Sequence, residues 1–209
     1  MAFLLGLTGN IACGKSTVGR LLTERYAAEY LDADAVVHAL YAAGTPQTQA
    51  IAARFGAHLL QTDGTLDRRR LGDVVLADRA ALRELEAILD PGVRAAINTR
   101  LSQTTAEVLV LDAIRLIEGG LYRRCDAVWV VLCARDLQHA RLEASRGLTP
   151  EQAALRIDAQ VPAETRLAHA TAVLRNDGSL VDLAVQVAAA WEQTVAPKLG
   201  AQRVQANPP

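Results

Sequence analysis

Residues 7–17 read LTGNIACGKST, and no other stretch constrains the fold of this chain as strongly. Gly9, Gly14, Lys15 and Ser16 match the pattern G-x-x-x-x-G-K-[ST], in which a glycine-rich turn joins a buried strand to a helix. The run FLLGLT before the turn is almost entirely apolar, as expected of a strand with both faces buried in a parallel sheet. The stretch therefore predicts a strand, a phosphate-binding loop and a helix, in that order.

The residue types in this loop suit a phosphate chain. Glycine lets the backbone turn tightly, so that successive N–H groups can surround an anion at the positive end of the following helix. Lys15 is one of only two lysines in the chain, and it supplies a compact charge where a planar guanidinium would fit poorly. Ser16 can ligate Mg²⁺, and we interpret Cys13 as a small neutral filler. We expect ATP to bind Gly9, Asn10, Ala12, Cys13, Gly14, Lys15, Ser16 and Thr17.

Two carboxylates follow the second predicted strand, at Asp32 and Asp34. Ligands of open parallel sheets bind beyond the carboxyl ends of the strands, so both side chains are candidates for the site. Transfer of a phosphoryl group to a hydroxyl needs one carboxylate to orient or accept the proton, and acidic or hydroxyl groups around Mg²⁺. One aspartate is expected to be the base, and the other a helix cap or a metal-shell residue. Their placement leaves open which is which.

Composition excludes several classes of protein. With 209 residues, the chain can form one sizeable core or a core with an inserted subdomain. Its net charge of −1 and its two Phe and two Trp argue against a nucleic-acid partner. No apolar stretch is long enough to span a bilayer, and we interpret the apolar start as a strand rather than a leader. Three cysteines without metal-ligand spacing favour a reducing, cytoplasmic setting.

Short apolar strands alternate with alanine-rich helices, which predicts an α/β fold. Strands are expected at residues 3–8, 29–32, 108–111, 127–133 and 171–174. Helices are expected at residues 15–29, 33–43, 47–54, 68–101, 138–145, 150–160, 163–170 and 180–195. The triplet Asp90-Pro91-Gly92 is expected to break the long helical block. The fold class is therefore a P-loop NTPase-type parallel sheet of about five strands, flanked by helices.

With these residues identified, the chain resembles the dephospho-coenzyme A kinase family over roughly residues 3–193. The phosphate loop alone is common to a whole superfamily, whereas the ordered set of matches is more specific. These matches include LTGNIACGKSTV, LDAD, GTPQTQAIAARFG, DGTLDRRRL, EAILDPGVR, VLDAIRLIEGGLY, LQHARLEASRGLT, LRIDAQ and RNDGSL.

The resemblance implies that ATP, with Mg²⁺, phosphorylates the ribose 3′-hydroxyl of dephospho-CoA, the last step of coenzyme A synthesis. It also implies one kinase domain over residues 1–200, with a helical acceptor-binding insertion and a helical lid. The expected parts are a core at about 1–45, 105–135 and 170–200, the insertion at about 46–104, the lid at about 136–168 and a disordered tail at 201–209. The expected oligomeric state is a monomer or a weak homo-oligomer.

The same resemblance assigns roles to single residues. Asp34 is the expected base and Lys15 the phosphate lysine, while Arg141 and Arg146 of the lid reach the transferring phosphate. Asn176 is expected near the adenine of ATP. The expected acceptor-binding residues are Asp32, Asp34, His38, Arg68 and Glu118, and the expected metal residues are Ser16 and Asp32. For His38, Arg68 and Glu118, the residue types alone also allow a helix-surface or helix-start role.

The chain departs from the usual family pattern at four points. Asn10 replaces the second glycine of a Thr-Gly-Gly start, and Asp90 replaces the histidine of a His-Pro pair. Ile114–Glu118 replaces a Pro-Leu-Leu-Phe-Glu run, and Arg175 replaces an aspartate. The change at Ile114–Glu118 leaves open a P-loop kinase of another nucleotide or small alcohol. A nucleotide-binding protein without catalysis is a separate alternative, against which Lys15, Ser16 and Asp34 argue.

Overall fold

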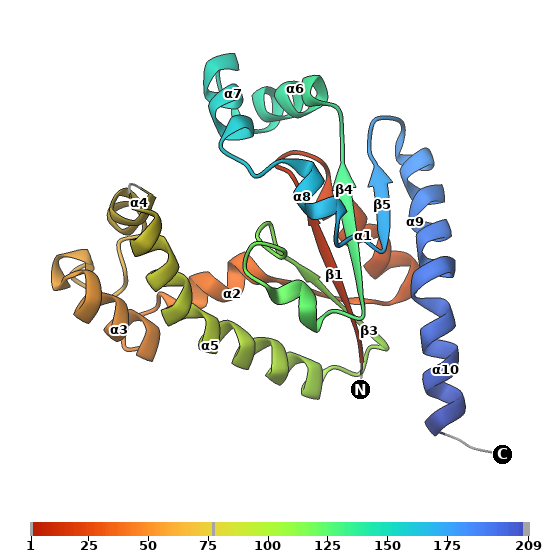
Figure 1. The fold of residues 1–209 in the computed structure, drawn as a ribbon, viewed down its shortest axis with the longest axis horizontal. Coiled ribbons are helices and arrows are strands. Elements are labelled where there is room, and N and C mark those ends of the chain that lie inside the picture. The colour runs from red at the N-terminus through yellow and green to blue at the C-terminus, as the bar shows by residue number, and fades with distance from the viewer. Residues whose placement is uncertain (1, 77, 207–209) are drawn as a thin grey trace. The chain divides into compact units, whose positions relative to one another are not determined.

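The computed structural model describes residues 2–76 and 78–206. The chain forms two compact units (Figure 1). The sheet unit comprises the chain up to Leu31 together with the chain from Thr104 onward, and the helical unit is Asp32–Gln103. Among the described residues, no helix has the length and apolar character needed to cross a bilayer.

A five-stranded sheet organises the first unit, and its strand order is β2-β3-β1-β4-β5. Its strands are β1 (Phe3–Gly9), β2 (Glu29–Asp32), β3 (Val108–Asp112), β4 (Ala127–Leu132) and β5 (Ala172–Arg175). β1 lies at the centre, parallel to both β3 and β4, and β4 is parallel to β5. The predicted α/β class and the predicted strands are confirmed. β2 and β3 lie on one side of β1, and β4 and β5 lie on the other. The loop after β1 is therefore at the point where the strand order reverses, which is where open α/β sheets bind ligands.

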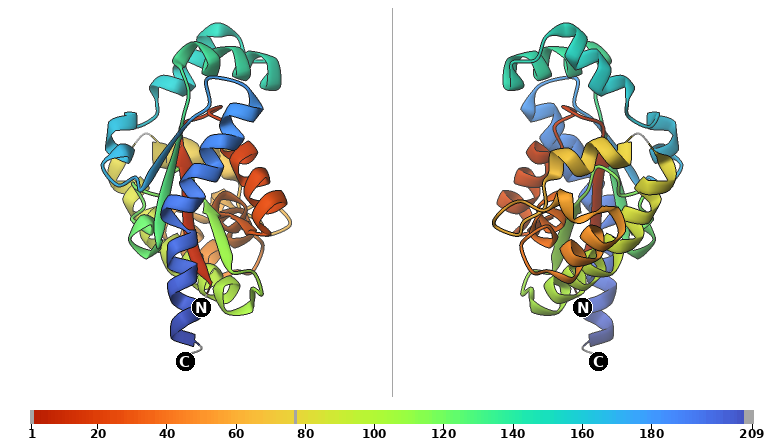
Figure 2. Two further views of the ribbon diagram at one scale, coloured as in Figure 1. Left: turned by 90° about the vertical axis from the view of Figure 1, so that its right-hand side faces the viewer. Right: turned by 90° about the vertical axis from the view of Figure 1, so that its left-hand side faces the viewer.

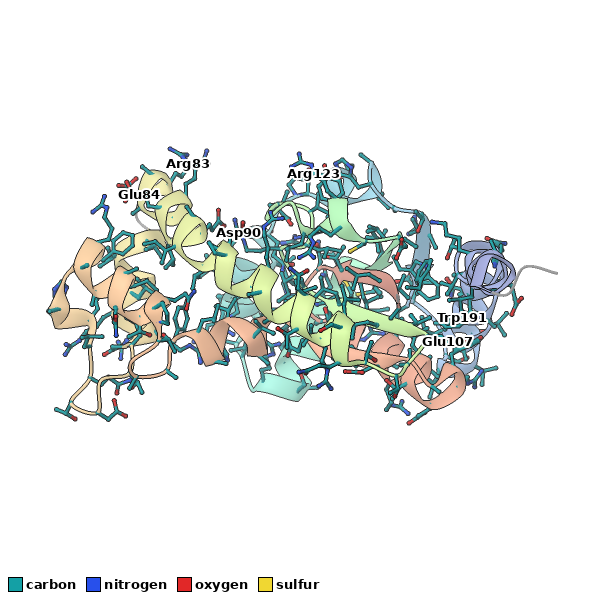
Figure 3. The ribbon with its side chains drawn as sticks, turned by 90° about the horizontal axis from the view of Figure 1, so that it is seen from below. Arg83, Glu84, Asp90, Glu107, Arg123 and Trp191 are labelled. Carbon is teal, nitrogen blue, oxygen red and sulfur yellow. The ribbon has the colours of Figure 1, made fainter. Side chains whose placement is uncertain are left out.

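Helices α1 (Lys15–Tyr26) and α9 (Leu180–Thr194) pack on one face of this sheet. Trp129 of β4 is fully buried there, and its indole N–H donates to Thr194 Oγ1 at 2.9 Å. Trp191 of α9 (Figure 3) stacks on Tyr26 with ring centroids 4.1 Å apart. Since both faces of the central strands are covered, these strands are apolar without alternation.

The opposite face of β1 is covered by the segment after β3, which includes the short helix η2 (Leu121–Arg124), and by α8 (Ala163–Leu167). A Cβ added at Gly6 of β1 would lie 2.7 Å from Leu116 Cδ2 and 2.8 Å from Cys125 Sγ. The segment therefore approaches the strand backbone so closely that glycine is needed at that position.

Helices α6 (Arg135–Arg146) and α7 (Pro150–Asp158) form a pair beyond the carboxyl end of β4 (Figure 1). Leu142, Ala153 and Ile157 form their small apolar core, and Ile11 and Ala12 of the glycine-rich loop pack against it. This pair corresponds to the first part of the predicted lid. The predicted lid range of 136–168 also contains α8, which packs against β1 and β4 instead.

The helical unit consists of α2 (Ala33–Leu40), α3 (Pro46–Phe55), α4 (Arg68–Leu76), α5 (Arg79–Gln103) and the short helix η1 (Ala57–Leu59). Its buried core includes Ile51, Leu59, Leu71 and Leu85. The unit begins at Asp32, earlier than the insertion predicted from residue 46, because the apolar side chains of α2 pack on this same core.

The predicted break at Asp90-Pro91-Gly92 is wrong, because α5 runs through it (Figure 3). Leu85, Leu89, Val93 and Ile97 are buried and recur every four residues, so one apolar stripe continues past the proline. Pro91 itself is exposed. Burial of this stripe outweighs the loss of one backbone hydrogen bond.

The C-terminal segment also corrects a prediction. α10 (Ala196–Ala206) continues in the direction of α9 (Figure 2), whereas residues 201–209 were expected to be disordered. The helix is anchored at its start, where Ala196 and Leu199 pack on the sheet core. The expectation is thus not met for residues 201–206, and residues 207–209 lie outside the described residues.

Gly19 of α1 offers a test of the packing between α1 and β2. A Cβ at Gly19 would lie 2.2 Å from the Tyr30 ring, so Gly19→Ala is expected to lower the free energy of unfolding by about 1–3 kcal/mol. Gly200→Ala in α10 is the control, because no atom lies within 4 Å of its added Cβ. Urea denaturation measures both variants. Equal stability of the two would contradict the close contact at Tyr30.

Candidate functional site

The loop between β1 and α1 has a backbone that only glycine can adopt at two positions. Gly9 has φ 156°, and a Cβ there would lie 2.3 Å from the carbonyl oxygen of Val131. Gly14 has φ 93°, and a Cβ there would lie 2.2 Å from Asn176 Nδ2. The two glycines of the sequence pattern are therefore required by contacts as well as by backbone conformation.

Helix α1 begins directly after this turn. Its N-cap is Gly14, which has no side chain to bond the first N–H groups, and its first turn contains no acidic residue. Lys15 is the first residue of the helix. Unsatisfied N–H groups and the positive end of the helix dipole make such a start an anion-binding site.

Three successive carbonyls of the loop accept hydrogen bonds from side chains. Gln138 donates to the Ile11 carbonyl at 2.8 Å, Arg141 to the Ala12 carbonyl at 3.2 Å, and Asn176 to the Cys13 carbonyl at 2.9 Å. In a trans peptide the N–H points opposite to the carbonyl. The N–H groups of Ala12 and Gly14 therefore face away from these side chains, as an anion nest requires, whereas the N–H of Cys13 donates to the Asn10 carbonyl at 3.3 Å.

A cavity of about 420 Å³ lies over the loop. It brings together nine of the residues that the sequence predicts for the site, from the loop, the start of α1 and α6. They are Asn10, Ala12, Cys13, Gly14, Lys15, Ser16, Thr17, Arg141 and Arg146. Asp112 and Ser145 complete the lining.

Arg141 and Arg146 reach this cavity in different ways. Arg141 donates to the carbonyls of Ala12 and Asn176, at 3.2 and 2.9 Å, and so ties α6 to the loop. Arg146 is exposed at the end of α6. Both arginines line the cavity together with Lys15, so three positively charged residues surround it.

Asn176 lies behind the loop rather than among the lining residues of the cavity. Its side chain is 8% exposed, and its amide donates to the Cys13 carbonyl. The neighbouring Asp177 accepts from the backbone N–H of Ala134 at 2.6 Å. Asn176 therefore supports the loop, and its predicted contact with adenine stays a prediction.

Asp112 is a lining residue that the sequence analysis missed. It ends β3, where it pairs with Leu7 of β1, and its carboxylate accepts a hydrogen bond from the Tyr30 hydroxyl. The sequence did contain a signal for it, namely an acidic residue at the carboxyl end of an apolar strand. Such a residue lies near the loop when its strand is next to β1. Asp112 and Ser16 line the same cavity, and their side chains carry oxygen ligands of the kind that Mg²⁺ prefers.

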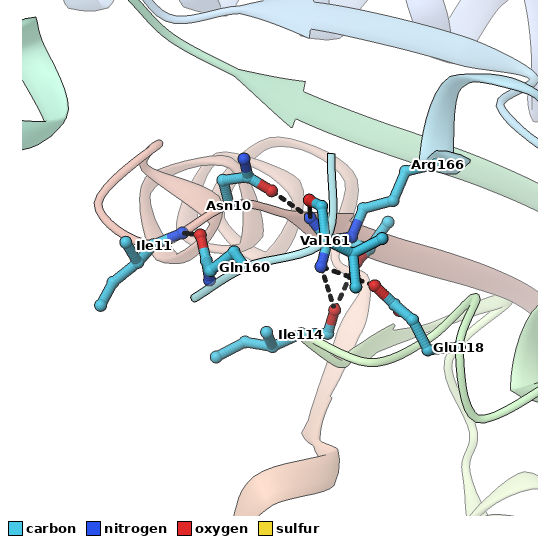
Figure 4. Close-up of polar contacts among 8 residues, drawn as sticks. Asn10, Ile11, Ile114, Glu118, Gln160, Val161 and Arg166 are labelled. Atoms are coloured by element: carbon cyan, nitrogen blue, oxygen red, sulfur yellow. Dashed lines mark hydrogen bonds and ion pairs between the residues drawn. The ribbon is translucent and has the colours of Figure 1, made fainter. Parts of the chain in front are cut away.

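Arg166 of α8 joins the loop to the segment after β3 (Figure 4). Its side chain is 2% exposed, donates to Asn10 Oδ1, and forms an ion pair with Glu118 at 2.7 Å. It also donates to the carbonyls of Ile114 and Val161, at 3.4 and 3.5 Å. Asn10, which departs from the usual glycine, thus has a structural partner.

This arrangement bears on the predicted role of Glu118. The sequence placed it among the acceptor-binding residues, but the structure directs one carboxylate oxygen to the buried Arg166 guanidinium. The side chain is only 12% exposed. A glutamate in the turn segment after β3 and an arginine 48 residues later give no sequence signal of pairing, so the contact could not be predicted.

The helical unit has a cavity of its own, of about 440 Å³. Asp34 and His38 of α2, Tyr41 and Arg68 provide its polar groups. Its apolar wall consists of Val37, Leu71, Val75 and Leu85. The structure therefore brings three predicted acceptor residues together, and adds Tyr41, whose pKa is raised by burial and partly lowered again by the Arg68 charge.

Asp32 differs from Asp34 in what it contacts. Its Oδ1 accepts from the backbone N–H groups of Asp34 and Ala35, at 2.8 and 3.4 Å, and so caps α2. Asp34 lines the cavity of the helical unit instead. This division matches the expectation that one aspartate of the pair has a capping role.

Known proteins similar to this chain give consistent matches. A family model described as dephospho-CoA kinase matches residues 3–182. A dephospho-CoA kinase of Symbiobacterium thermophilum is 45% identical over 191 residues, which cover 90% of this chain and 80% of the relative. One of Geobacter metallireducens is 38% identical over 195 residues, covering 92% and 96%. A crystal structure from Thermus thermophilus has 32% identity and a TM-score of 0.76, with 96% of this chain and 97% of that chain covered.

The buried ion pair predicts an asymmetry between two glutamates. Glu118→Gln leaves the buried Arg166 charge uncompensated, so the free energy of unfolding is expected to fall by about 3 kcal/mol. Glu24→Gln removes the exposed partner of Arg20 on α1 and should cost less than about 1 kcal/mol. Urea denaturation of the two variants checks this. A loss at Glu118 no larger than at Glu24 would contradict the structural role of the pair.

Proposed function

Because the chain belongs to the dephospho-CoA kinase family, we propose that it transfers the terminal phosphoryl group of ATP to the ribose 3′-hydroxyl of dephospho-CoA, which yields coenzyme A and ADP. The observation that carries this proposal is the cavity over the glycine-rich loop. Lys15, Arg141 and Arg146 line it together with the start of α1.

The donor side of the reaction needs charge neutralisation. The loop N–H groups and Lys15 bind the β- and γ-phosphates, and Arg141 and Arg146 stabilise the charge of the transferring group. Ser16 and Asp112 would hold Mg²⁺, either directly or through water. When bound, the ion supplies further positive charge to the phosphate oxygens.

The acceptor side is proposed to be the cavity of the helical unit. Asp34 accepts the proton of the 3′-hydroxyl, while the oxygen of that hydroxyl bonds to the γ-phosphorus and ADP leaves. Arg68 offers a charge for an acceptor phosphate, while the apolar wall suits the less polar parts of the molecule. Asp32 positions this base by capping α2.

Water must be excluded from the reaction, since otherwise ATP is hydrolysed. The α6–α7 pair carries two arginines of the donor cavity and packs on the loop, so we propose that it is the lid. We further propose a cytoplasmic location, for which the three free cysteines are the support.

The two lysines of the chain provide a matched test of the donor site. Lys15→Ala is expected to lower ATP-dependent phosphorylation of dephospho-CoA by at least about a hundredfold, because a charge at the transferring phosphate is lost. Lys198→Ala, whose native ammonium bonds the Asp126 carbonyl, is expected to stay within about twofold. A coupled ADP-release assay, with and without dephospho-CoA, measures both. Equal turnover of the two variants would refute the role of Lys15.

The base assignment has its own test. Asp34→Asn should lower kcat by about 10² to 10⁴ while the affinity for ATP stays nearly unchanged, because the side chain is isosteric and belongs to the acceptor cavity. Asp32→Asn is the comparison, since an amide can still cap α2. A fall of only two- to threefold at Asp34, or a larger fall at Asp32, would count against the assignment.

A further inference from the structure

Two of the three thiols of the chain are in contact. Cys13 Sγ, in the glycine-rich loop, lies 3.6 Å from Cys133 Sγ, in the residue after β4. The Cys133 thiol also lies 3.8 Å from the Ala12 carbonyl. β1 and β4 are parallel neighbours, paired up to Gly9 and Val131, so the segments that follow them leave the same edge of the sheet. The fold therefore holds the pair together although 120 residues separate the two cysteines.

The surroundings activate one thiol of the pair. A hydrogen bond from the Cys133 thiol lowers the pKa of Cys13 to about 7, with a further lowering by the Lys15 charge and an opposing effect of burial. The pKa of Cys133 is raised by the same contact with Cys13 and by burial. Near neutral pH, one sulfur can thus be a thiolate while the other keeps its proton. By contrast, burial raises the pKa of Cys125 to about 12.

We propose that Cys13 and Cys133 are a site of reversible disulfide formation that switches off the phosphate loop. The oxidant is a hydroperoxide. The thiolate attacks its outer oxygen and becomes a sulfenic acid, while the O–O bond breaks and an alcohol or water leaves. The second sulfur then bonds to the sulfenic sulfur and water leaves, so two thiols and one hydroperoxide give one disulfide. Cys13 is only 1% exposed, whereas Cys133 is partly exposed, so the oxidant reaches the pair from the Cys133 side.

The disulfide is expected to distort the loop. Sulfur atoms 3.6 Å apart have to approach to about 2.05 Å, and one of them lies between Ala12 and Gly14. Both neighbours have positive φ, with values of 58° and 93°. The Cys133 proton that the pair shares is lost as well. The N–H groups around the phosphate site are therefore expected to move enough to weaken ATP binding and to slow phosphoryl transfer.

The first experiment detects the bond itself, and it does not depend on the proposed function. Cys125→Ala removes the third thiol, and Cys125→Ala/Cys133→Ala also removes one of the pair. Both proteins are treated with hydrogen peroxide near neutral pH. Intact mass and peptide mapping of the first should give one intramolecular disulfide between residues 13 and 133, which dithiothreitol reverses. Sulfinic or sulfonic acids, disulfides between molecules, or no reaction would overturn the proposal.

The second experiment measures the consequence. Binding of a fluorescent ATP analogue should weaken by roughly ten- to a hundredfold in oxidised Cys125→Ala and recover with dithiothreitol. Phosphorylation of dephospho-CoA, a readout that rests on the proposed function, should follow the same course. Prior addition of ATP should slow disulfide formation, because Cys13 lines the cavity in which ATP is proposed to bind. An equal and reversible loss of analogue binding in oxidised Cys125→Ala/Cys133→Ala would contradict the proposal. A disulfide that leaves analogue binding unchanged would also contradict it.

Discussion

The orientation of a few peptide groups after β1 is the constraint on which the site depends. Side chains of Gln138, Arg141 and Asn176 bond three successive loop carbonyls. These donors belong to α6 and to the segment after β5, so the loop conformation is fixed by parts of the chain that follow it by more than 120 residues. With its carbonyls satisfied, the loop can present N–H groups to a phosphate without a large ordering cost on binding.

The buried charge of Arg166 extends this support to the other side of the loop. An arginine that is 2% exposed requires partners, and Asn10, Glu118 and two carbonyls provide them. Asn10 replaces a glycine of the usual pattern, and its amide oxygen is what Arg166 contacts. The departure in sequence and the buried arginine thus belong to one arrangement, which also includes Glu118.

Local sequence patterns predicted part of the fold and of the site. The spacing of Gly9, Gly14 and Lys15 and the apolar strand before them predicted the loop, the helix after it and the central strand. The unbroken course of α5 was missed because a buried stripe in a folded protein outweighs a proline that local propensity treats as a break. The hydrogen bonds of Asn176 and Arg166 to the loop could not be predicted, since contacts between residues so far apart in sequence depend on the tertiary fold.

The central claim is that the cavity over residues 9–17 binds the phosphates of ATP. A crystal structure with a nonhydrolysable ATP analogue and Mg²⁺ tests it most directly. The account predicts triphosphate density against the loop N–H groups, with the Lys15 ammonium at the β- and γ-phosphates and the guanidinium of Arg141 beside them. Triphosphate density elsewhere in the molecule, with this loop empty, would contradict it.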